Sequence, residues 1–457
     1  MLDPVEIRAN PDGLRRAVRL RRVDPNKANV DRWLQIDEQR RNLLGQLGSL
    51  NAEKNKLAAL GKSDPVAARE KGKELRDQIR AVEEGLSKVS EEWQSIMDWF
   101  PNWPHPEMPE GAGPEENVEE SAWIPGRGYL PKDLLGRGET SASAMPPVPV
   151  HAEETDFVAP HYADLCERLG GIDTLQASKV SGTRFAYIYG EVALMQWAIT
   201  RLLTERLLEL GMKPIIPPLL VRERALYGTS HFPEGRDQVY QIQSHNVEDA
   251  ATLFLVGSSE PSNFSFFMDR VFEQDELPIK FYASTPCFRS EAGSWGRDSK
   301  GIKRVHQFDK VEMNAVCTPE QSAEIYEEFR EVNEWLLQQL ELPYRVIEKC
   351  TGDAGYLATH RQRDLEVWLS GTKEFMEVMT DTNTTDYQAR RLGIRYRTDG
   401  KPKFCHTVND TGCAMGRMLI AILDNYQQKN GSVKVPKVLR SVVQMDELTP
   451  GRRLGVR

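Results

Sequence analysis

The feature that most constrains the fold is a long heptad pattern of apolar residues within residues 28–98. In its second half the apolar residues recur alternately four and three positions apart: Leu75, Ile79, Val82, Leu86, Val89, Trp93 and Ile96. The first half carries a matching seam, interrupted by Arg40 and Lys54. Its apolar members are Trp33, Ile36, Leu43, Leu47, Leu50 and Leu57. Such spacing is typical of helices that pack along one seam.

The segment LGKSDP separates the two seams and has the composition of a turn, with Gly61, Asp64 and Pro65. The sequence therefore predicts two helices of about 33 residues that form an antiparallel hairpin and project roughly 50 Å. A dimerisation coiled coil and an arm that reaches a long partner are both compatible with this pattern. A basic cluster precedes the hairpin: Arg15, Arg16, Arg19, Arg21 and Arg22.

Composition is that of an ordinary globular protein, with 457 residues, 28% of them charged and 40% hydrophobic. The net charge of −9 argues against coating nucleic acid over the whole surface but leaves a local basic face possible. No apolar run approaches the roughly 20 residues that a membrane helix needs. The first residues contain acids and no apolar core of a secretory signal, so we expect a cytoplasmic protein. The six cysteines form no CxxC pair, so neither a disulfide framework nor a zinc finger is predicted.

The chain divides into three expected regions. An N-terminal domain covers residues 1–110 and carries the hairpin. A linker and loop region covers residues 111–150, because residues 101–117 and 132–150 are rich in proline, glycine, small residues or acids. A second domain covers residues 151–457. Its short strands and helices follow no regular βαβ repeat, which predicts an α+β fold with an antiparallel sheet.

Charged residues concentrate in FRSEAGSWGRDSKGIKRVHQFDKVE, residues 288–312. If both ends are strands, Arg289 and Glu291 share a face of the first, and Phe308, Lys310 and Glu312 share a face of the second. Together they would offer a guanidinium to phosphate, a ring to a purine and carboxylates to an amine. Taken alone, this segment favours the alternative of a surface hairpin with ordinary ion pairs.

A second segment, NDTGCAMGRMLIAILDNYQ, places Gly412 and Gly416 before an apolar-periodic helix that has Arg417 at its start. A glycine-rich entry into a helix N-terminus suits an anion, and an arginine there can hold terminal phosphates. The loop between the two strands of the first segment adds further glycines and Arg297. The two segments together favour a nucleotide site.

These segments resemble those of class II aminoacyl-tRNA synthetases, and the bacterial-type seryl-tRNA synthetases in particular. GMKPIIPPLLV is similar to motif 1 of that class, residues 288–312 to motif 2, and GCAMGRMLIAILDNYQ to motif 3. SGTRFAYIYGEVALM, CTGDAGYLA, DLEVWLSG and DYQARRLGIRYR also match stretches of the family. The resemblance covers essentially the whole chain. It implies an antiparallel sheet flanked by helices, a homodimer, and an N-terminal hairpin that grips the long variable arm of a tRNA.

The resemblance also implies an activity and roles for matching residues. The activity is that of a serine–tRNA ligase of protein biosynthesis, which forms seryl-adenylate from serine and ATP with magnesium and passes the seryl group to tRNA. Arg289 would hold the α-phosphate, Glu291 would contact the adenine side of ATP, Phe308 would stack on adenine, and Arg417 would hold the γ-phosphate. The expected ATP site comprises Arg289, Glu291, Arg304, Phe308, Glu377, Thr380 and Arg417, of which Arg289, Glu291 and Arg417 are the catalytic candidates.

Glu377 and Thr380 would also hold magnesium. The expected amino-acid site comprises Ser258, Glu260, Arg289, Glu312 and Thr411. Because the reaction requires no protein nucleophile, we expect Cys287 and Cys413 to be packing residues.

Several segments near the expected amino-acid site depart from the family pattern. SSE (258–260) replaces TAE, MTDTN (379–383) replaces SSCSN, and NDTG (409–412) replaces NGSG. The segment GTSHFPEGRD replaces a GTGQLPKF-like loop, and Arg363 stands where the family has tyrosine. Asp381 and Asp410 thus add carboxylates near a pocket for a small amino acid. They could alter the amino acid selected, or reflect drift around an unchanged pocket.

Three functions follow as hypotheses. The first is the serine–tRNA ligase. The second is a specialised paralogue that activates serine or another small amino acid for a biosynthetic or antibiotic-resistance role. The third is a non-catalytic synthetase-like module that binds RNA or protein. The presence of Arg289, Glu291, Phe308 and Arg417 argues against the third.

Overall fold

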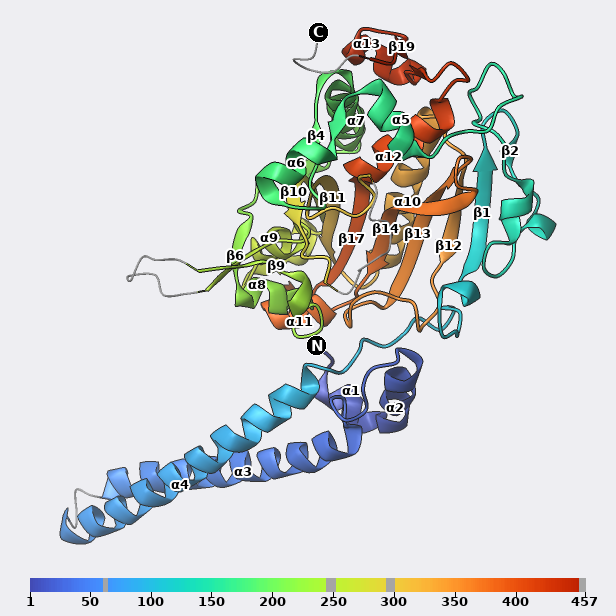
Figure 1. Ribbon diagram of the computed structural model, residues 1–457. Coiled ribbons are helices and arrows are strands. Elements are labelled where there is room, and N and C mark those ends of the chain that lie inside the picture. Colours follow the sequence, from blue (N-terminus) through green and yellow to red (C-terminus); the bar gives the residue numbers. More distant parts are fainter. Residues whose placement is uncertain (61–64, 244–251, 293–300, 452–457) are drawn as a thin grey trace. The chain divides into compact units, whose positions relative to one another are not determined.

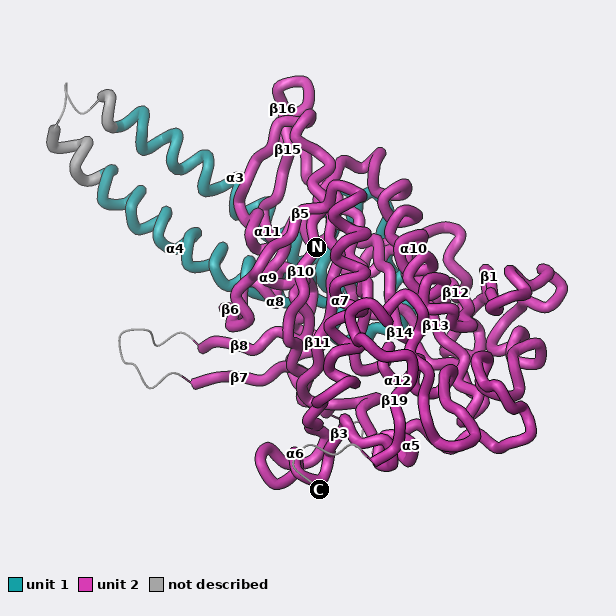
Figure 2. Tube along the Cα trace, turned by 90° about the horizontal axis from the view of Figure 1, so that it is seen from above, with its two compact units in different colours: residues 1–101 teal, residues 102–457 magenta. Residues whose placement is uncertain are grey.

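The computed structural model describes residues 1–60, 65–243, 252–292 and 301–451. It divides into two compact units, residues 1–101 and residues 102–457 (Figure 2). This division falls about nine residues before the end of the expected N-terminal domain. The turn expected at Gly61 and Asp64, and the loop residue Arg297, lie outside the described residues.

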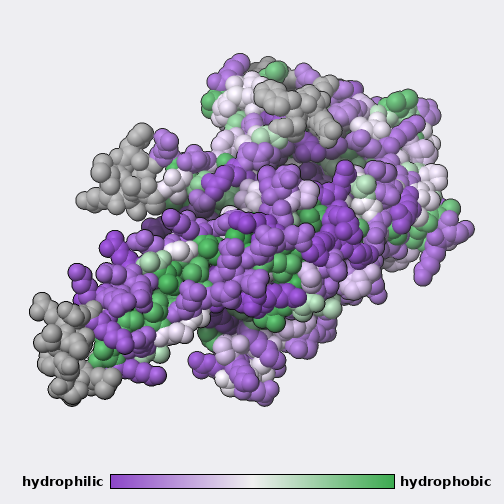
Figure 3. All heavy atoms as spheres, turned by 90° about the horizontal axis from the view of Figure 1, so that it is seen from below, coloured by the Kyte–Doolittle hydropathy of each residue, from purple (hydrophilic) through white to green (hydrophobic). Residues whose placement is uncertain are grey.

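The first unit contains the predicted hairpin. Its helices are α1 (Pro4–Ala9), α2 (Pro11–Leu20), α3 (Val30–Leu60) and α4 (Pro65–Met97). The last two pack against each other in opposite directions, because Arg32 Nε lies 2.7 Å from Glu92 Oε1 and Arg40 Nε lies 3.2 Å from Ser90 Oγ. Figure 3 shows hydrophobic side chains gathered along the hairpin between hydrophilic ones. The heptad prediction of two long helices is confirmed.

The base of the hairpin is a compact core. Trp33 and Trp93 pack against each other across the two helices with tilted rings whose centroids are 5.5 Å apart, and the Phe100 ring packs edge-on against Trp33 at 5.9 Å. Asp37 is buried here, accepts a hydrogen bond from Trp93 Nε1 at 3.1 Å and pairs with Arg8 at 3.1 Å. Because this core joins both helices to α1, it fixes the hairpin within its own unit.

The second unit is built on a nine-stranded sheet with the order β2-β1-β12-β13-β14-β17-β11-β10-β5 (Figure 1). All neighbours are antiparallel except β10 and β5. The strands are β1 (Val118–Ile124), β2 (Gly128–Tyr129), β5 (Lys213–Pro214), β10 (Ile279–Phe288), β11 (Gln307–Cys317), β12 (Tyr344–Glu348), β13 (Arg361–Leu369), β14 (Glu374–Asn383) and β17 (His406–Ala414). This is the α+β architecture expected from the sequence.

The expected linker over residues 111–150 is partly wrong, because β1 and β2 form the edge of this sheet. Trp123 of β1 pairs with Tyr344 of β12, and Glu119 is buried. The Glu119 carboxylate accepts hydrogen bonds from the Ser141 hydroxyl at 2.7 Å and from Arg345 Nη1 at 2.9 Å. Residues 111–150 are therefore bound into the second unit by strand pairing and by a buried ion pair.

Helices pack on the sheet and enclose a large apolar core, which includes Val311, Leu336, Leu365 and Leu419. The helices of this unit are α5 (Tyr162–Leu169), α6 (Thr174–Ser181), α7 (Gly190–Glu209), α8 (Glu223–Gly228), α9 (Glu260–Ser265), α10 (Ser322–Gln339), α11 (Tyr387–Leu392), α12 (Met415–Tyr426) and α13 (Arg440–Val443). Smaller sheets use β3 (Ile172–Asp173), β4 (Tyr187–Ile188), β6 (Leu220–Arg222), β7 (Gln241–Ile242), β8 (Leu253–Leu255), β9 (Val271–Glu273), β15 (Arg395–Thr398), β16 (Lys401–Phe404), β18 (Val433–Lys434) and β19 (Glu447–Leu448).

All six cysteines, including Cys287 and Cys413, are buried. Within the described ranges, no helix has both the length and the apolar character that crossing a bilayer requires.

Candidate active site

Two adjoining cavities open on the face of the large sheet formed by β11, β17, β14 and β13. The larger, of about 220 Å³, is lined by residues that include Ser258, Glu260 and Glu312. The smaller, of about 60 Å³, is lined by residues that include Glu291, Arg304, Phe308 and Arg417. Four residues line both cavities: Arg289, Lys310, Glu377 and Thr411. The structure thus brings together every residue expected to bind ATP or the amino acid.

The strand β11 places Phe308, Lys310 and Glu312 along this cleft, as the alternation of side chains predicted. The expectation for the preceding strand was wrong. The strand β10 ends at Phe288, so Arg289 and Glu291 lie beyond it, and Glu291 has a left-handed backbone with φ of 51°. Both residues still line the smaller cavity, because the turn, and not strand alternation, directs them there.

Arg289 lies where the two cavities meet. Its Nε donates to the carbonyl oxygen of Gly257 at 3.1 Å, and its guanidinium carbon lies 5.4 Å from the centre of the Phe308 ring. These contacts fix the guanidinium plane beside the aromatic ring that closes the smaller cavity. Arg304 Nη1 lies 3.7 Å from Glu291 Oε2 at the other side of this cavity.

The larger cavity has an ammonium group at its centre. Lys310 Nζ forms an ion pair with Glu312, donates to Ser258 Oγ at 2.9 Å and lies 3.3 Å from Thr411 Oγ1. Lys310 and Glu312 are both buried. Burial raises the pKa of Glu312, and Lys310 and Arg289 oppose that rise. The departure from TAE to SSE therefore keeps a hydroxyl that accepts a hydrogen bond within the cavity.

Glu260 forms a second anionic point in this cavity. Its Oε1 accepts hydrogen bonds from Gln388 Nε2 at 2.7 Å and Asn409 Nδ2 at 3.1 Å, and its Oε2 lies 3.9 Å from His231 Nε2. Burial and the charge of Glu312 raise the pKa of Glu260 to about 8. Burial, with Arg289 and Lys310 nearby, lowers the pKa of His231 to about 3, so this imidazole is neutral. A carboxyl with a raised pKa suits a cationic ligand, whose binding favours ionisation.

A chain of polar contacts crosses the floor of the cleft. Arg417 Nη1 donates to Glu377 Oε1 at 2.9 Å, and Thr380 Oγ1 lies 3.3 Å from the same oxygen. Thr380 Oγ1 also donates to Asp364 Oδ1 at 2.9 Å, and Asp364 Oδ2 lies 3.0 Å from Lys349 Nζ. Burial opposes ionisation of Glu377, but Arg417, Lys349 and Arg289 outweigh it and hold the pKa of that carboxyl below its ordinary value. The Glu377 carboxylate therefore faces the cleft in its ionised form.

The entry to α12 differs in detail from the sequence expectation. Gly412 belongs to β17, which passes directly into the helix at Ala414, and Gly416 lies in the first turn. Arg417 lines the smaller cavity as expected. Its position therefore depends on a strand-to-helix junction and not on a separate glycine-rich loop.

Asp381 and Asp410 do not line either cavity, which corrects the hypothesis that they add charge to the amino-acid pocket. Thr380 and Thr382 line the larger cavity, so the intervening Asp381 faces the opposite side of the sheet. Asp381 and Asp410 are partners across β14 and β17, and both are completely buried. Asn333 of α10 donates to Asp410 Oδ2 at 2.7 Å.

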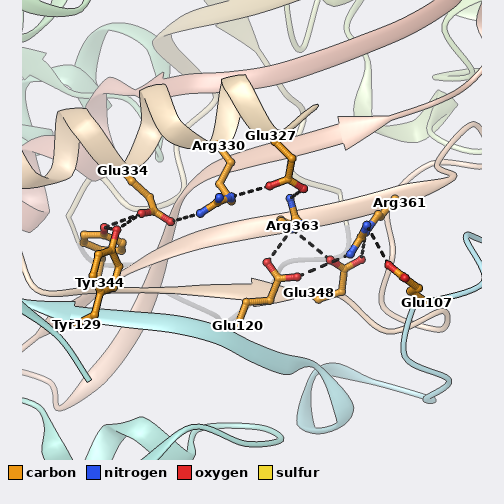
Figure 4. Close-up of polar contacts among 10 residues, drawn as sticks. All are labelled: Glu107, Glu120, Tyr129, Glu327, Arg330, Glu334, Tyr344, Glu348, Arg361 and Arg363. Carbon is orange, nitrogen blue, oxygen red and sulfur yellow. Dashed lines mark hydrogen bonds and ion pairs between the residues drawn. The ribbon is translucent and has the colours of Figure 1, made fainter. Parts of the chain in front are cut away.

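The same side of the sheet holds Arg363, the replacement for the family's tyrosine (Figure 4). Its guanidinium pairs with Glu120 at 2.7 Å, Glu327 at 2.7 Å and Glu348 at 3.2 Å. Arg363 therefore belongs to a buried ionic network between α10 and the sheet, and Asp381 is its neighbour on the adjacent strand. This departure acts on packing behind the site and not on the pocket.

This carboxylate pair predicts a pH-dependent stability. Burial and mutual charge raise the pKa of Asp381 well above its ordinary value, with Arg363 opposing and Glu327 and Glu348 adding to the rise. Burial raises the pKa of Asp410 in the same direction; Asn333 and Lys310 oppose that rise, and Glu312 adds to it. The folded state therefore keeps protons that the unfolded chain loses near pH 4. The pair's stabilisation is complete below that pH and is lost as pH rises through the folded pKa values.

Replacing Asp381 with asparagine should reduce this dependence, because only the Asp410 carboxyl of the pair then titrates. The new amide can donate to Asp410 Oδ1, which has no hydrogen-bond partner in the part of the chain that the structure describes. We expect Asp381→Asn to stabilise the protein by about 1–2 kcal/mol at pH 8.5 and to change little at pH 5. Thermal unfolding across this pH range measures the effect, with exposed Asp446→Asn as the control. An equal shift at all pH values would contradict the interpretation.

Sequence reasoning gave no role to several residues that complete the site. They are His231, Lys349, Tyr356, Asp364 and Gln388. Polar residues at alternate positions of a strand, Gln362 and Asp364 in β13, could have indicated the last strand of the cleft. Lys349 follows β12 directly. The sequence alone does not show that the segment after this strand faces the cavity.

Two family models match the chain. Residues 1–104 match the seryl-tRNA synthetase N-terminal domain, and residues 240–426 match the tRNA synthetase class II core domain (G, H, P, S and T). The serine–tRNA ligase of Pyrococcus horikoshii is 36% identical and the alignment covers 98% of each chain. That of Rubrobacter xylanophilus is 36% identical over 99% of this chain and 100% of its own.

Two solved structures of seryl-tRNA synthetases are similar to this chain over nearly its whole length. Seryl-tRNA synthetase from P. horikoshii complexed with ATP superposes with a TM-score of 0.87 at 35% identity, over 99% of this chain and 100% of that one. Cytoplasmic serine–tRNA ligase from Naegleria fowleri in complex with AMP gives 0.81 at 26% identity, over 97% and 96%. The chain therefore belongs to the seryl-tRNA synthetase family, with the class II synthetase fold and the family's N-terminal arm domain.

Proposed function

We propose that this protein is a serine–tRNA ligase that activates serine with ATP and transfers it to tRNA. The observation that carries the proposal is the position of Arg289 on the boundary between the two cavities. One cavity has paired carboxylates that suit an ammonium group, and the other has Phe308, Arg304 and Arg417, which suit a nucleotide. Arg289 therefore lies where a bound amino acid's carboxylate would meet the α-phosphate of ATP.

The residues present account for the chemistry of activation. Glu260 accepts hydrogen bonds from the ammonium group of serine. Phe308 stacks on adenine, and Glu291 contacts the edge of the adenine ring. The serine carboxylate attacks the α-phosphorus, pyrophosphate leaves, and Arg289 stabilises the charge that develops on the α-phosphate oxygens. Arg417 holds the departing phosphates. The seryl group then passes to a ribose hydroxyl at the tRNA end, and AMP is released.

Glu377 and Thr380 fit a magnesium ion, because a carboxylate and a hydroxyl 3.3 Å apart are hard oxygen donors. They would hold the ion together with phosphate oxygens of ATP. When bound, magnesium would supply charge neutralisation at the phosphates. In the structure Arg417 donates a hydrogen bond to one oxygen of Glu377. When ATP is bound, Arg417 would turn toward the γ-phosphate.

The hairpin of α3 and α4 is part of the same proposal, as the arm that contacts the long variable arm of tRNA. Of the basic cluster near its base, Arg16, Arg19 and Arg22 are exposed, whereas Arg15 pairs with Asp31. Ile216, in the segment similar to motif 1, is 99% exposed, which supports a homodimer through that segment. A cytoplasmic location follows from the tRNA substrate.

The test is amino-acid-dependent ATP–pyrophosphate exchange with a panel of amino acids. We expect exchange with serine at the highest kcat/KM. Exchange with another amino acid but not serine would contradict the proposal and favour the specialised paralogue. Absence of exchange with every amino acid would favour the non-catalytic module, which the intact nucleotide residues argue against.

A further inference from the structure

Lys349 is a half-buried cation in the cleft that the chemistry above does not use. It follows β12 directly, lines the larger cavity, and its side chain is 14% exposed. Its Nζ lies 3.0 Å from Asp353 Oδ2 and 3.0 Å from Asp364 Oδ2. Asp353 Oδ2 also accepts from Asn117 Nδ2 at 2.9 Å. The ammonium group is thus anchored on one side and holds the carboxylate of Asp364 on the other.

Asp364, held in position by Lys349, in turn orients the hydroxyl of Thr380. One oxygen of Asp364 faces Lys349, and the other accepts the Thr380 hydroxyl at 2.9 Å. A hydroxyl has a single hydrogen, so donation to Asp364 leaves the lone pairs of Thr380 Oγ1 available toward Glu377, whose Oε1 is 3.3 Å away. Two oxygens that both present lone pairs are what a bound cation requires. With the hydrogen turned toward Glu377, Thr380 could not serve as a ligand.

We propose that Lys349 is a positioning residue for the magnesium–ATP site and acts through Asp364 on the hydroxyl of Thr380. This inference rests on the proposed function, since it assigns magnesium to Glu377 and Thr380. Partners that orient the ligands of a metal commonly change metal affinity 10–100-fold when they are removed. A lysine that merely stabilised the fold would not distinguish ATP with magnesium from ATP without it.

The test is the binding of ATP to the full chain, measured by calorimetry at increasing magnesium and separately with EDTA. Lys349→Met should raise the magnesium concentration at half-effect by about 10-fold. ATP affinity in EDTA should stay within about twofold of wild type. Lys349→Arg keeps the charge and should shift the magnesium concentration at half-effect by a smaller factor. This variant serves as the test if Lys349→Met folds poorly. Lys280→Met is the matched control, because Lys280 is similarly shielded and pairs with Glu328 at 2.7 Å outside both cavities.

The outcomes separate the two proposals. If wild type shows magnesium-dependent ATP binding and Lys349→Met shows the same dependence, the positioning role is overturned. If the variant weakens ATP equally with and without magnesium, Lys349 contacts ATP or supports the fold generally, and the inference also fails. If wild-type ATP binding does not respond to magnesium, the assignment of Glu377 and Thr380 is itself wrong, and the role of Lys349 falls with it.

Discussion

Arg289→Ala is expected to lower kcat for serine-dependent ATP–pyrophosphate exchange by about 10²–10³-fold. The physical reason is the loss of a preorganised cation at the oxygens where charge develops during attack on the α-phosphorus. Serine and ATP would still meet Glu260, Phe308 and Arg417, so the two KM values should change much less than kcat. Arg289→Lys should recover part of the rate, because an ammonium keeps the charge but not the planar fork.

The control for this prediction is Arg224→Ala, which removes an ion-paired arginine of the same unit outside both cavities. Thermal unfolding of Arg289→Ala must be measured as well, because the Arg289 Nε bond to Gly257 is lost. Exchange by a folded Arg289→Ala within tenfold of wild type would show that the guanidinium does not act at the α-phosphate.

Shortening the hairpin should separate transfer from activation. Residues 42–87 can be replaced by a short turn, because Arg40 and Ser90 lie side by side across α3 and α4. The core of Trp33, Trp93 and Phe100 then remains. The removed part carries exposed basic residues: Lys54, Lys56, Lys71, Lys73, Arg76 and Arg80. We expect exchange within about twofold of wild type and a fall in kcat/KM for tRNA charging of at least about 100-fold, or about 2.7 kcal/mol.

If the shortened chain charges tRNA at the wild-type rate, the arm takes no part in tRNA recognition. A parallel loss of exchange and charging would instead indicate that the deletion damages the catalytic unit. The salt dependence of charging offers a further check, because loss of cation–phosphate contacts lowers the salt slope.

The extent to which the sequence predicts this molecule depends on how local each feature is. The hairpin was predictable because a heptad spacing from Leu75 to Ile96 is a property of neighbouring residues. The strand β1 was not, because its composition resembles the acidic linker around it and its partner β12 lies more than 200 residues away. Strand pairing of this kind supplies stability that no local pattern reveals.

The site likewise combines residues whose positions follow from local sequence with residues whose positions depend on the folded sheet. The residues of β11 were placed on one face by alternation, whereas Arg289 and Glu291 reach the cleft from a turn with a left-handed residue. The same alternation, applied between Thr380 and Thr382, would have turned Asp381 away from the pocket. Register shifts between Leu365 and Glu366, and similar irregularities in β11, make such assignments depend on the folded sheet.

Activation of serine is measured most directly by the ATP–pyrophosphate exchange rate of the full chain with serine, compared with alanine, threonine and cysteine at equal concentration. The larger cavity is lined by polar groups, such as Glu312 and Thr411, that can hydrogen-bond the hydroxyl of serine. It should therefore strongly reject an analogue that lacks the hydroxyl, by about 10⁴-fold for alanine. We therefore expect exchange with serine and almost none with alanine. Equal exchange with both, or a preference for another amino acid, would contradict this expectation.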